Sequence, residues 1–167
     1  SVVLWGHSQG GQAVAFAAQR AHQYAPELTI RAVAAAAPAA DLSTILTPQA
    51  QAALPEMNSL CLLTHITKLH RIAQPLVGHF TTGDPSVVQP WATLLQQNSA
   101  GGVKFDAPLF VAQGLDDTLV LPSDTAKFID VERRTGITVE YHTVDKATHA
   151  TIAYLALPTL WKWLEAQ

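Results

Sequence analysis

Short hydrophobic runs alternate with longer amphipathic segments along the chain. Four of the runs are apolar on nearly every residue or rich in β-branched residues, which is typical of strands in a parallel sheet. The amphipathic segments repeat their apolar residues every three or four positions, as helices do. The order strand–helix–strand–irregular segment–strand–helix–strand–helix predicts an α/β fold with a mostly parallel sheet, flanking helices and right-handed crossovers. The strands are expected at residues 2–5, 30–37, 108–113 and 137–144, and the helices at 12–24, 122–135 and 151–166.

The spacing of apolar residues alone does not assign residues 30–37 or the C-terminal segment from residue 148. Residues 30–37 are rich in alanine, which favours a helix. The run is short, follows a helix and a turn, and ends at Pro38, so we interpret it as a buried strand. Residues 148–150 are expected to form a loop, and the last helix is expected to bend at Pro158.

Residues 41–98 show no strand alternation. Prolines and glycines interrupt helix-like pieces at residues 48–54, 57–69 and 91–97. We interpret this segment as a helical insertion, or cap, in a core domain formed by residues 1–40 and 99–167.

The composition excludes several classes of protein. The 167 residues are 49% hydrophobic and 14% charged, which excludes intrinsic disorder. A net charge of −3 argues against a protein that binds nucleic acid through its phosphates. Cys61 is the single cysteine, so neither an internal disulfide nor a cysteine-rich zinc site is expected. The longest apolar run, residues 32–40, is too short to span a bilayer.

The turn after the first strand carries the candidate chemistry. Gly6-His7-Ser8-Gln9-Gly10 fits the pattern G-x-S-x-G between a strand and a helix, where the flanking glycines avoid Cβ clashes and the serine hydroxyl is exposed for nucleophilic attack. The backbone N–H of Gln9 would be one oxyanion-hole donor, and His7 is expected to line the substrate site or to pack beside it. The alternatives are a glycine-rich turn with an incidental serine and a phosphate-binding turn, but the latter lacks a P-loop lysine and the G-x-G-x-x-G spacing.

A serine nucleophile needs a carboxylate that orients its general base. In a strand–turn–helix context the chain order is Ser, then Asp or Glu, then His, and catalytic groups follow the carboxyl ends of strands. Asp117, three residues after Gly114 at the end of the third strand, is the expected acid. Asp116 is the nearest alternative and is assigned to the turn, Asp124 is expected to help cap the next helix, and Asp41 is a more distant alternative.

His149 is the expected general base because it follows the last strand, lies downstream of the acid and has small neighbours. Asp145 competes with Asp117 as its partner. The remaining histidines are expected to pack or to lie on the surface: His7, His22, His65, His70, His79 and His142. No metal and no cofactor is predicted, since H-E-x-x-H is absent and the pair His65 and His70 has no clear third ligand.

Three stretches together resemble the C-terminal two-thirds of an α/β-hydrolase: residues 4–11, 113–120 and 148–150. The turn Ser8-Gln9-Gly10-Gly11, the helical insertion and the stretch 91–98 are similar to the secretory lipase and carboxylesterase family. The resemblance implies a catalytic triad of Ser8, Asp117 and His149. It also implies a small-molecule or lipid ester as substrate and an extracellular, secreted location.

The chain departs from this family at its start. Such hydrolases have several strands and an early loop before the nucleophile, and that loop supplies the second oxyanion donor. We therefore expect an N-terminally truncated domain whose first strand leaves an open sheet edge or an exposed apolar face. Secreted members often carry disulfides, which Cys61 alone cannot form internally.

The expected activity is hydrolysis of a carboxylic ester through an acyl-enzyme. Apolar residues of the insertion would cover the site and bind the acyl chain, or form only the core of the cap: Leu60, Leu62, Leu63, Ile66, Leu69, Ile72, Leu76 and Val77. The alternatives are a serine peptidase or acyltransferase on the same fold, and an inactive fragment or binding module, because losing one oxyanion donor costs about 10²–10³ in rate. Neither a nucleic-acid partner nor stable membrane insertion is expected, and the sequence predicts no oligomeric state.

Overall fold

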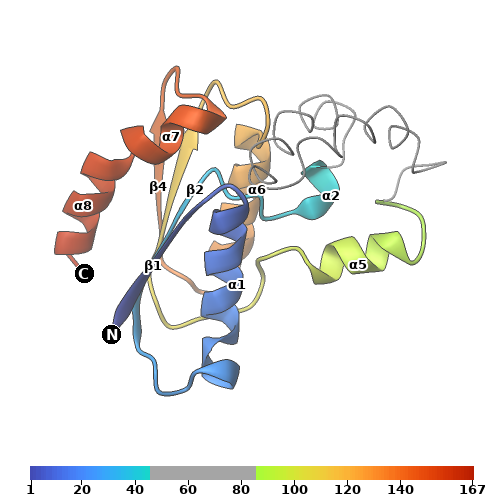
Figure 1. The fold of residues 1–167 in the computed structure, drawn as a ribbon, viewed down its shortest axis with the longest axis horizontal. Coiled ribbons are helices and arrows are strands. Elements are labelled where there is room, and N and C mark those ends of the chain that lie inside the picture. Colours follow the sequence, from blue (N-terminus) through green and yellow to red (C-terminus); the bar gives the residue numbers. More distant parts are fainter. Residues whose placement is uncertain (46–85) are drawn as a thin grey trace, which may run out of the picture.

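The computed structural model describes residues 1–45 and 86–167. In this part of the chain, four parallel strands form one sheet in the order β1-β2-β3-β4 (Figure 1). The strands are β1 (Val2–His7), β2 (Ile30–Ala36), β3 (Leu109–Gly114) and β4 (Val139–Val144). The helices are α1 (Gln9–Tyr24), α2 (Leu42–Ile45), α5 (Trp91–Gln97), α6 (Pro122–Arg134), α7 (His149–Leu155) and α8 (Leu157–Glu165). The predicted α/β class with a parallel sheet is confirmed.

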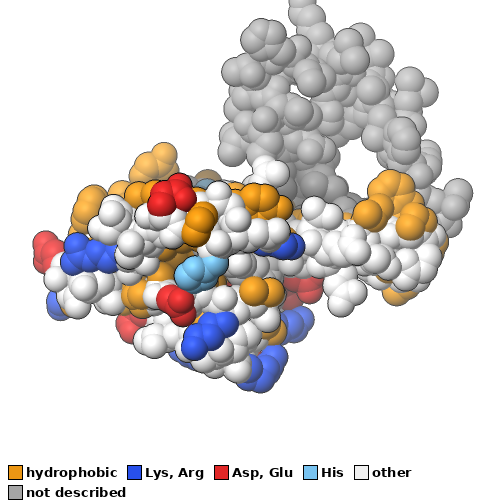
Figure 2. Space-filling model, turned by 90° about the horizontal axis from the view of Figure 1, so that it is seen from below, with side chains coloured by type: hydrophobic (Ala, Val, Ile, Leu, Met, Phe, Trp, Pro, Cys, Tyr) orange, Lys and Arg blue, Asp and Glu red, His pale blue; other side chains and the backbone are white. Residues whose placement is uncertain are grey.

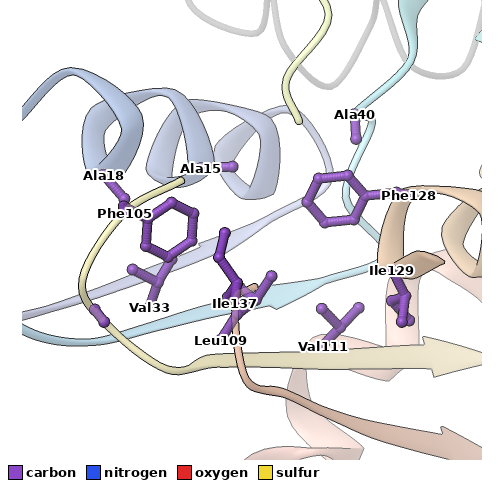
Figure 3. Packing of buried hydrophobic residues seen from close by; sticks show 11 residues of the cluster. Ala15, Ala18, Val33, Ala40, Phe105, Leu109, Val111, Phe128, Ile129 and Ile137 are labelled. Atoms are coloured by element: carbon purple, nitrogen blue, oxygen red, sulfur yellow. The ribbon is translucent and has the colours of Figure 1, made fainter. Parts of the chain in front are cut away.

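Helices α1 and α6 cover one face of the sheet (Figure 1). Alternate residues of the central strands, Val33 of β2 and Leu109 and Val111 of β3, point to this face and are fully buried. Figure 3 shows Phe128 of α6 and Phe105, before β3, packed over them. Full burial of a large apolar side chain stabilises the fold by roughly 1.5–3 kcal/mol. This cluster therefore holds the sheet against α1 and α6.

Helices α7 and α8 cover the opposite face of β2, β3 and β4. The small side chains of β2 that point this way, including Ala34 and Ala36, let these helices approach the sheet closely. On β3, the buried ring of Phe110 packs against Trp163 of α8, with ring centroids 5.4 Å apart. The sheet thus has two separate apolar clusters, one on each side.

Strand β1 lies at one edge of the described sheet. Trp5 pairs in register with Ala34, so it faces the side of α7 and α8. These helices leave Val3 43% and Trp5 37% exposed. The expected open edge with an exposed apolar face is therefore present at β1.

Several predicted boundaries change in the structure. Helix α1 begins at Gln9, three residues earlier than expected, because the chain turns into the helix directly after Ser8. His149 was expected in a loop, but it is the first residue of α7, with Thr148 as N-cap. The single last helix is two helices that meet at Ala156, since Pro158 occupies the first turn of α8. The helix expected at residues 91–97 is α5, whereas the pieces at 48–54 and 57–69 lie outside the described residues.

Charged side chains are sparse on the surface. Figure 2 views the molecule from the end at which the strands begin and shows Lys and Arg side chains interspersed with Asp and Glu. Exposed hydrophobic side chains lie between them on this face. The low charge of the sequence thus corresponds to a mixed surface on the described part of this face.

Candidate active site

Ser8, His149 and Asp117 form one chain of hydrogen bonds. The Oγ of Ser8 lies 2.8 Å from Nε2 of His149, and Nδ1 of His149 lies 2.8 Å from Oδ2 of Asp117. The three residues follow β1, β4 and β3, so all lie at the carboxyl edge of the sheet. The carboxylate of Asp117 is fully buried and the imidazole of His149 is 17% exposed, while Ser8 is half-buried. The series of hydrogen bonds therefore runs from a half-buried serine to a carboxylate that is shielded from water.

The backbone of Ser8 adopts φ 58° and ψ −120°, which is unfavourable for a residue with a side chain. Such a conformation costs on the order of 1–3 kcal/mol and persists only where its surroundings enforce it. Here the Ser8 N–H donates to Ala36 O at 2.9 Å, and the Ser8 carbonyl accepts from Ala39 N at 3.1 Å and Gln12 N at 3.2 Å. These bonds hold the serine at the apex of the turn.

Gly6 is needed for this turn because a Cβ at residue 6 would overlap the carbonyl oxygen of Gly10. The sequence predicted the same need for both flanking glycines. At Gly10, however, an added Cβ would meet nothing within 4 Å. The steric requirement therefore lies on the strand side of the turn.

Asp117 is held by four donors. Its Oδ1 accepts from the backbone N–H groups of Leu119 and Val120, both at 2.9 Å. Its Oδ2 accepts from His149 and, at 3.3 Å, from the side-chain amide of Gln113. With both oxygens bonded, the carboxylate keeps one orientation toward the imidazole.

Gln113 was missed by the sequence reasoning, which placed it in an apolar strand. Its side chain is fully buried at the end of β3 and forms a small polar network. Nε2 also donates to Val120 O at 3.0 Å, and Oε1 accepts from the Thr125 hydroxyl of α6 at 2.6 Å. The available signal was one amide in an otherwise apolar strand, four residues before the acid.

A close backbone approach brings the two loops of the site together. A Cβ at Gly114 would overlap the carbonyl oxygen of Ala147, and the Asp116 N–H donates to this same oxygen at 3.0 Å. The loop after β3 thus lies against the segment that leads into α7. Thr148 and Thr151 form a capping box there, with Thr148 N donating to Thr151 Oγ1 at 2.9 Å, so the position of His149 is set by the start of a helix.

His7 precedes the serine and contacts His149. Its Nε2 lies 2.8 Å from the His149 carbonyl oxygen, and the two ring centroids are 4.7 Å apart. A carbonyl oxygen only accepts, so Nε2 of His7 carries the proton and donates it. Burial and the nearby His149 lower the pKa of His7, which favours the neutral imidazole.

The alternative acids lie elsewhere. The side chain of Asp116 is exposed, and so is that of Asp145. Asp41 accepts from the Ser43 N–H at 2.9 Å, at the beginning of α2. Asp124 was expected to cap α6, but α6 has no side-chain cap; Asp124 instead forms an ion pair with Lys127 at 3.0 Å.

The alternative bases also lie away from Ser8. His22 is exposed and pairs with Asp106 at 3.1 Å. His142 faces the Thr159 hydroxyl at 3.4 Å. His65, His70 and His79 lie outside the described residues.

Three further properties of the described residues were compared with the site. A cavity of about 520 Å³ lies between α2, α5 and α6, and its walls include Asp41, Thr93 and Phe128 but neither Ser8 nor His149. Within the described ranges, no group of three or more His, Cys, Asp or Glu side chains is placed to hold a metal ion. Across the same residues, every helix is too short or too polar to cross a membrane.

Comparison with solved structures defines the class of fold. Candida antarctica lipase A matches with a TM-score of 0.68 and 22% identity, covering 96% of this chain and 47% of the lipase. An α/β hydrolase from the metagenome of sediments of the Mar Chica lagoon in Morocco matches with a TM-score of 0.58 and 15% identity, over 99% and 62% of the two chains. A puromycin-hydrolysing peptidase of Mycobacterium tuberculosis matches with a TM-score of 0.61 and 16% identity, covering 99% of this chain and 22% of the peptidase. The chain has an α/β-hydrolase fold, and it spans about half the length of the lipase.

Sequence comparison narrows the resemblance within this class. The secretory lipase family matches residues 1–62, the segment that contains β1, the Ser8 turn, α1 and β2. The predicted resemblance to secretory lipases is thus confirmed over this segment. No curated protein sequence matches the chain.

Proposed function

We propose that this chain is the catalytic portion of a serine carboxylic-ester hydrolase, an esterase or lipase, with Ser8, His149 and Asp117 as its triad. The observation that carries the proposal is the unbroken hydrogen-bond chain from Ser8 through His149 to Asp117, with both bonds at 2.8 Å. The secretory lipase match over residues 1–62 supports the ester class. A secreted location rests on the same match.

The geometry supports a two-step reaction. Nδ1–H of His149 donates to Asp117, so Nε2 is free of a proton and accepts the one from Ser8 Oγ as the serine attacks the ester carbonyl. Asp117 keeps this tautomer and stabilises the imidazolium. Collapse of the tetrahedral intermediate releases the alcohol, which takes the proton from His149 and leaves an acyl group on Ser8. Water then gives a proton to His149 and attacks the acyl carbonyl. The bond from that carbon to Ser8 Oγ breaks, Ser8 takes the proton back from His149, and the carboxylic acid is released.

The developing oxyanion needs donors near Ser8. We assign the Gln9 backbone N–H as one of them, since Gln9 is the first residue of α1 and follows the nucleophile directly. The positive end of the helix dipole adds to this stabilisation. In this reading the Gly6–Gly10 turn is a nucleophile elbow, and the strained serine backbone is part of its geometry.

We propose that residues 41–98 form a cap over the core of residues 1–40 and 99–167. Helices α2 and α5 are the described part of residues 41–98. The leucine-rich residues 60–77 assigned to acyl-chain binding lie outside the described residues. A small-molecule or lipid ester is the proposed substrate class.

Hydrolysis of p-nitrophenyl esters of increasing acyl length tests the function. The protein and its Ser8→Ala variant are compared, with His22→Gln as a control because His22 is exposed and distant in the fold. We expect turnover that Ser8→Ala abolishes and that a fluorophosphonate blocks by labelling Ser8. Equal slow hydrolysis by both proteins contradicts the proposal and favours an inactive binding module, whereas faster cleavage of matched p-nitroanilides favours a peptidase.

A further inference from the structure

His7 connects the strand that carries the nucleophile to the helix that carries the base. It is the last residue of β1, and the carbonyl that accepts its hydrogen bond belongs to the first residue of α7, 142 positions away in the sequence. The bond is 2.8 Å long and partly buried. The sequence predicted only that His7 lines the substrate site or packs beside it, and it did not predict this contact.

Three contacts act on different parts of His149. The hydrogen bond from His7 fixes the backbone from which the His149 side chain extends. The His7 ring, tilted by 41° with centroids 4.7 Å apart, limits the imidazole on one side. Asp117 fixes the Nδ1 end at 2.8 Å. These contacts constrain the imidazole whose Nε2 lies 2.8 Å from Ser8 Oγ.

We propose that His7 is a positioning residue that holds His149 in line with Ser8. The inference rests on the proposed function, since it assigns a role within the same site. The hydrogen bond of His7 ends on the His149 backbone carbonyl, whereas Ser8 Oγ bonds to His149 Nε2, so His7 acts through His149.

The charge of His7 also affects His149, because the two rings are in contact. The titratable groups that face it are His149 and, more weakly, Asp117. A second cation so close to His149 would oppose formation of the imidazolium. Burial and proximity to His149 keep His7 neutral, and a neutral ring donates its Nε2 proton without this repulsion.

Two substitutions at His7 separate the effect of its hydrogen bond from the effect of its aromatic ring. His7→Gln keeps an N–H donor of similar reach and cannot ionise, whereas His7→Phe keeps an aromatic ring and loses the donor. We expect His7→Phe to lower kcat about 10–100-fold with little change in KM, because a small misplacement of a catalytic group has effects of this size. His7→Gln is expected to retain activity within several-fold of the wild type. His22→Gln serves as the control.

Either of two kinetic results would overturn the inference. An unchanged kcat in His7→Phe shows that the contact positions nothing. A raised KM with an unchanged kcat in both variants shows that His7 binds substrate instead. Thermal unfolding of each variant verifies that the loss does not come from misfolding, and His7→Gln remains informative if His7→Phe does not fold.

Imidazole ¹⁵N NMR distinguishes failure of the inference from failure of the proposed function. We expect the Nε2–H signal of His7 in the wild type, and a change in the His149 resonances in His7→Phe that is reversed in His7→Gln. Identical His149 spectra in all three proteins would refute the positioning role. Absence of ester turnover and of fluorophosphonate labelling in the wild type would refute the proposed function and leave the NMR result interpretable.

Discussion

The side-chain amide of Gln113 donates to the carboxylate of Asp117 at 3.3 Å in a fully buried position at the end of β3. The same amide also bonds Val120 O and receives a hydrogen bond from Thr125. A buried polar network is stabilising when every member is satisfied and costly when one member is removed. Gln113 therefore links the stability of the β3–α6 connection to the orientation of the Asp117 carboxylate.

Replacing Thr125 with valine tests this link without a large change in volume. Thr125→Val removes the 2.6 Å bond to Gln113 Oε1 and leaves that buried oxygen without its donor. We expect a loss of about 1–3 kcal/mol in the free energy of unfolding, the usual cost of a buried unsatisfied group. Urea unfolding measures it. Thr125→Ser keeps the hydroxyl and is the matched control; equal stability of the two variants would contradict the network.

Asp117 and its neighbour Asp116 form a natural pair for testing the acid. Asp117→Asn is expected to lower kcat by roughly 10³–10⁴-fold, because an amide no longer selects the correct imidazole tautomer. Asp116→Asn changes an exposed side chain and is expected to stay within a few-fold of the wild type. Steady-state ester hydrolysis is the measurement. A larger loss in Asp116→Asn would transfer the role to Asp116.

The two glycines of the serine turn are predicted to respond in opposite directions to alanine. Gly6→Ala forces a Cβ into the Gly10 carbonyl and is expected to unfold the turn and lower the melting temperature. Gly10→Ala meets open space within α1 and is expected to be neutral or to stabilise by up to about 1 kcal/mol. Thermal unfolding compares them, and a similar loss in both would show that the turn tolerates no side chain at either end.

Glu132 of α6 gives the protein a predicted pH dependence of stability. Its side chain is fully buried, Oε2 has no hydrogen-bond partner, and Gln19 lies 3.5 Å from Oε1. Burial raises the pKa of this carboxyl from 4.5 to about 7, although a hydrogen bond from the Gly102 backbone opposes the shift. The folded state thus retains a proton that the unfolded chain releases above pH 4.5. The stability that the folded state gains from holding this proton is fully present below pH 4.5 and is lost as the pH rises through about 7.

Glu132→Gln removes this titration. The variant is expected to be more stable than the wild type above pH 7 by on the order of 2–3 kcal/mol, and to lose that advantage toward pH 4.5. Urea midpoints at pH 5 and pH 8 measure the difference. Glu140→Gln, at an exposed position of β4, is the control and should show no such dependence. A constant difference between Glu132→Gln and the wild type across this range would show that Glu132 does not titrate there.

Local sequence patterns account for much of the fold and for the choice of site residues. Apolar runs predicted β1, β2 and β3 because buried parallel strands are short and hydrophobic, and β-branched residues in residues 137–144 predicted β4. Pro122 marked the start of α6. The order Ser8, Asp117, His149 followed from the carboxyl ends of those strands, and the structure places these three side chains together.

The contacts around these residues could not be predicted in the same way. The hydrogen bond from His7 to the His149 carbonyl depends on how the end of β1 is placed relative to the start of α7, and no local sequence pattern determines this placement. No local pattern marks the carboxyl of Glu132 as buried, because burial of that face of α6 depends on how α1 and α6 pack together. The boundary at His149 was misplaced since the Thr148 cap depends on the Thr151 side chain.

The hydrogen bond between Ser8 and His149 joins residues 141 positions apart. Contacts of such long sequence separation slow folding, because much of the chain must be ordered before they can form. This bond closes only when β1 and β4, the two outer strands of the described sheet, are both in register with the strands between them. We therefore expect reactivity of Ser8 toward a fluorophosphonate to appear late in folding, and its time course during refolding would report when the full topology is reached.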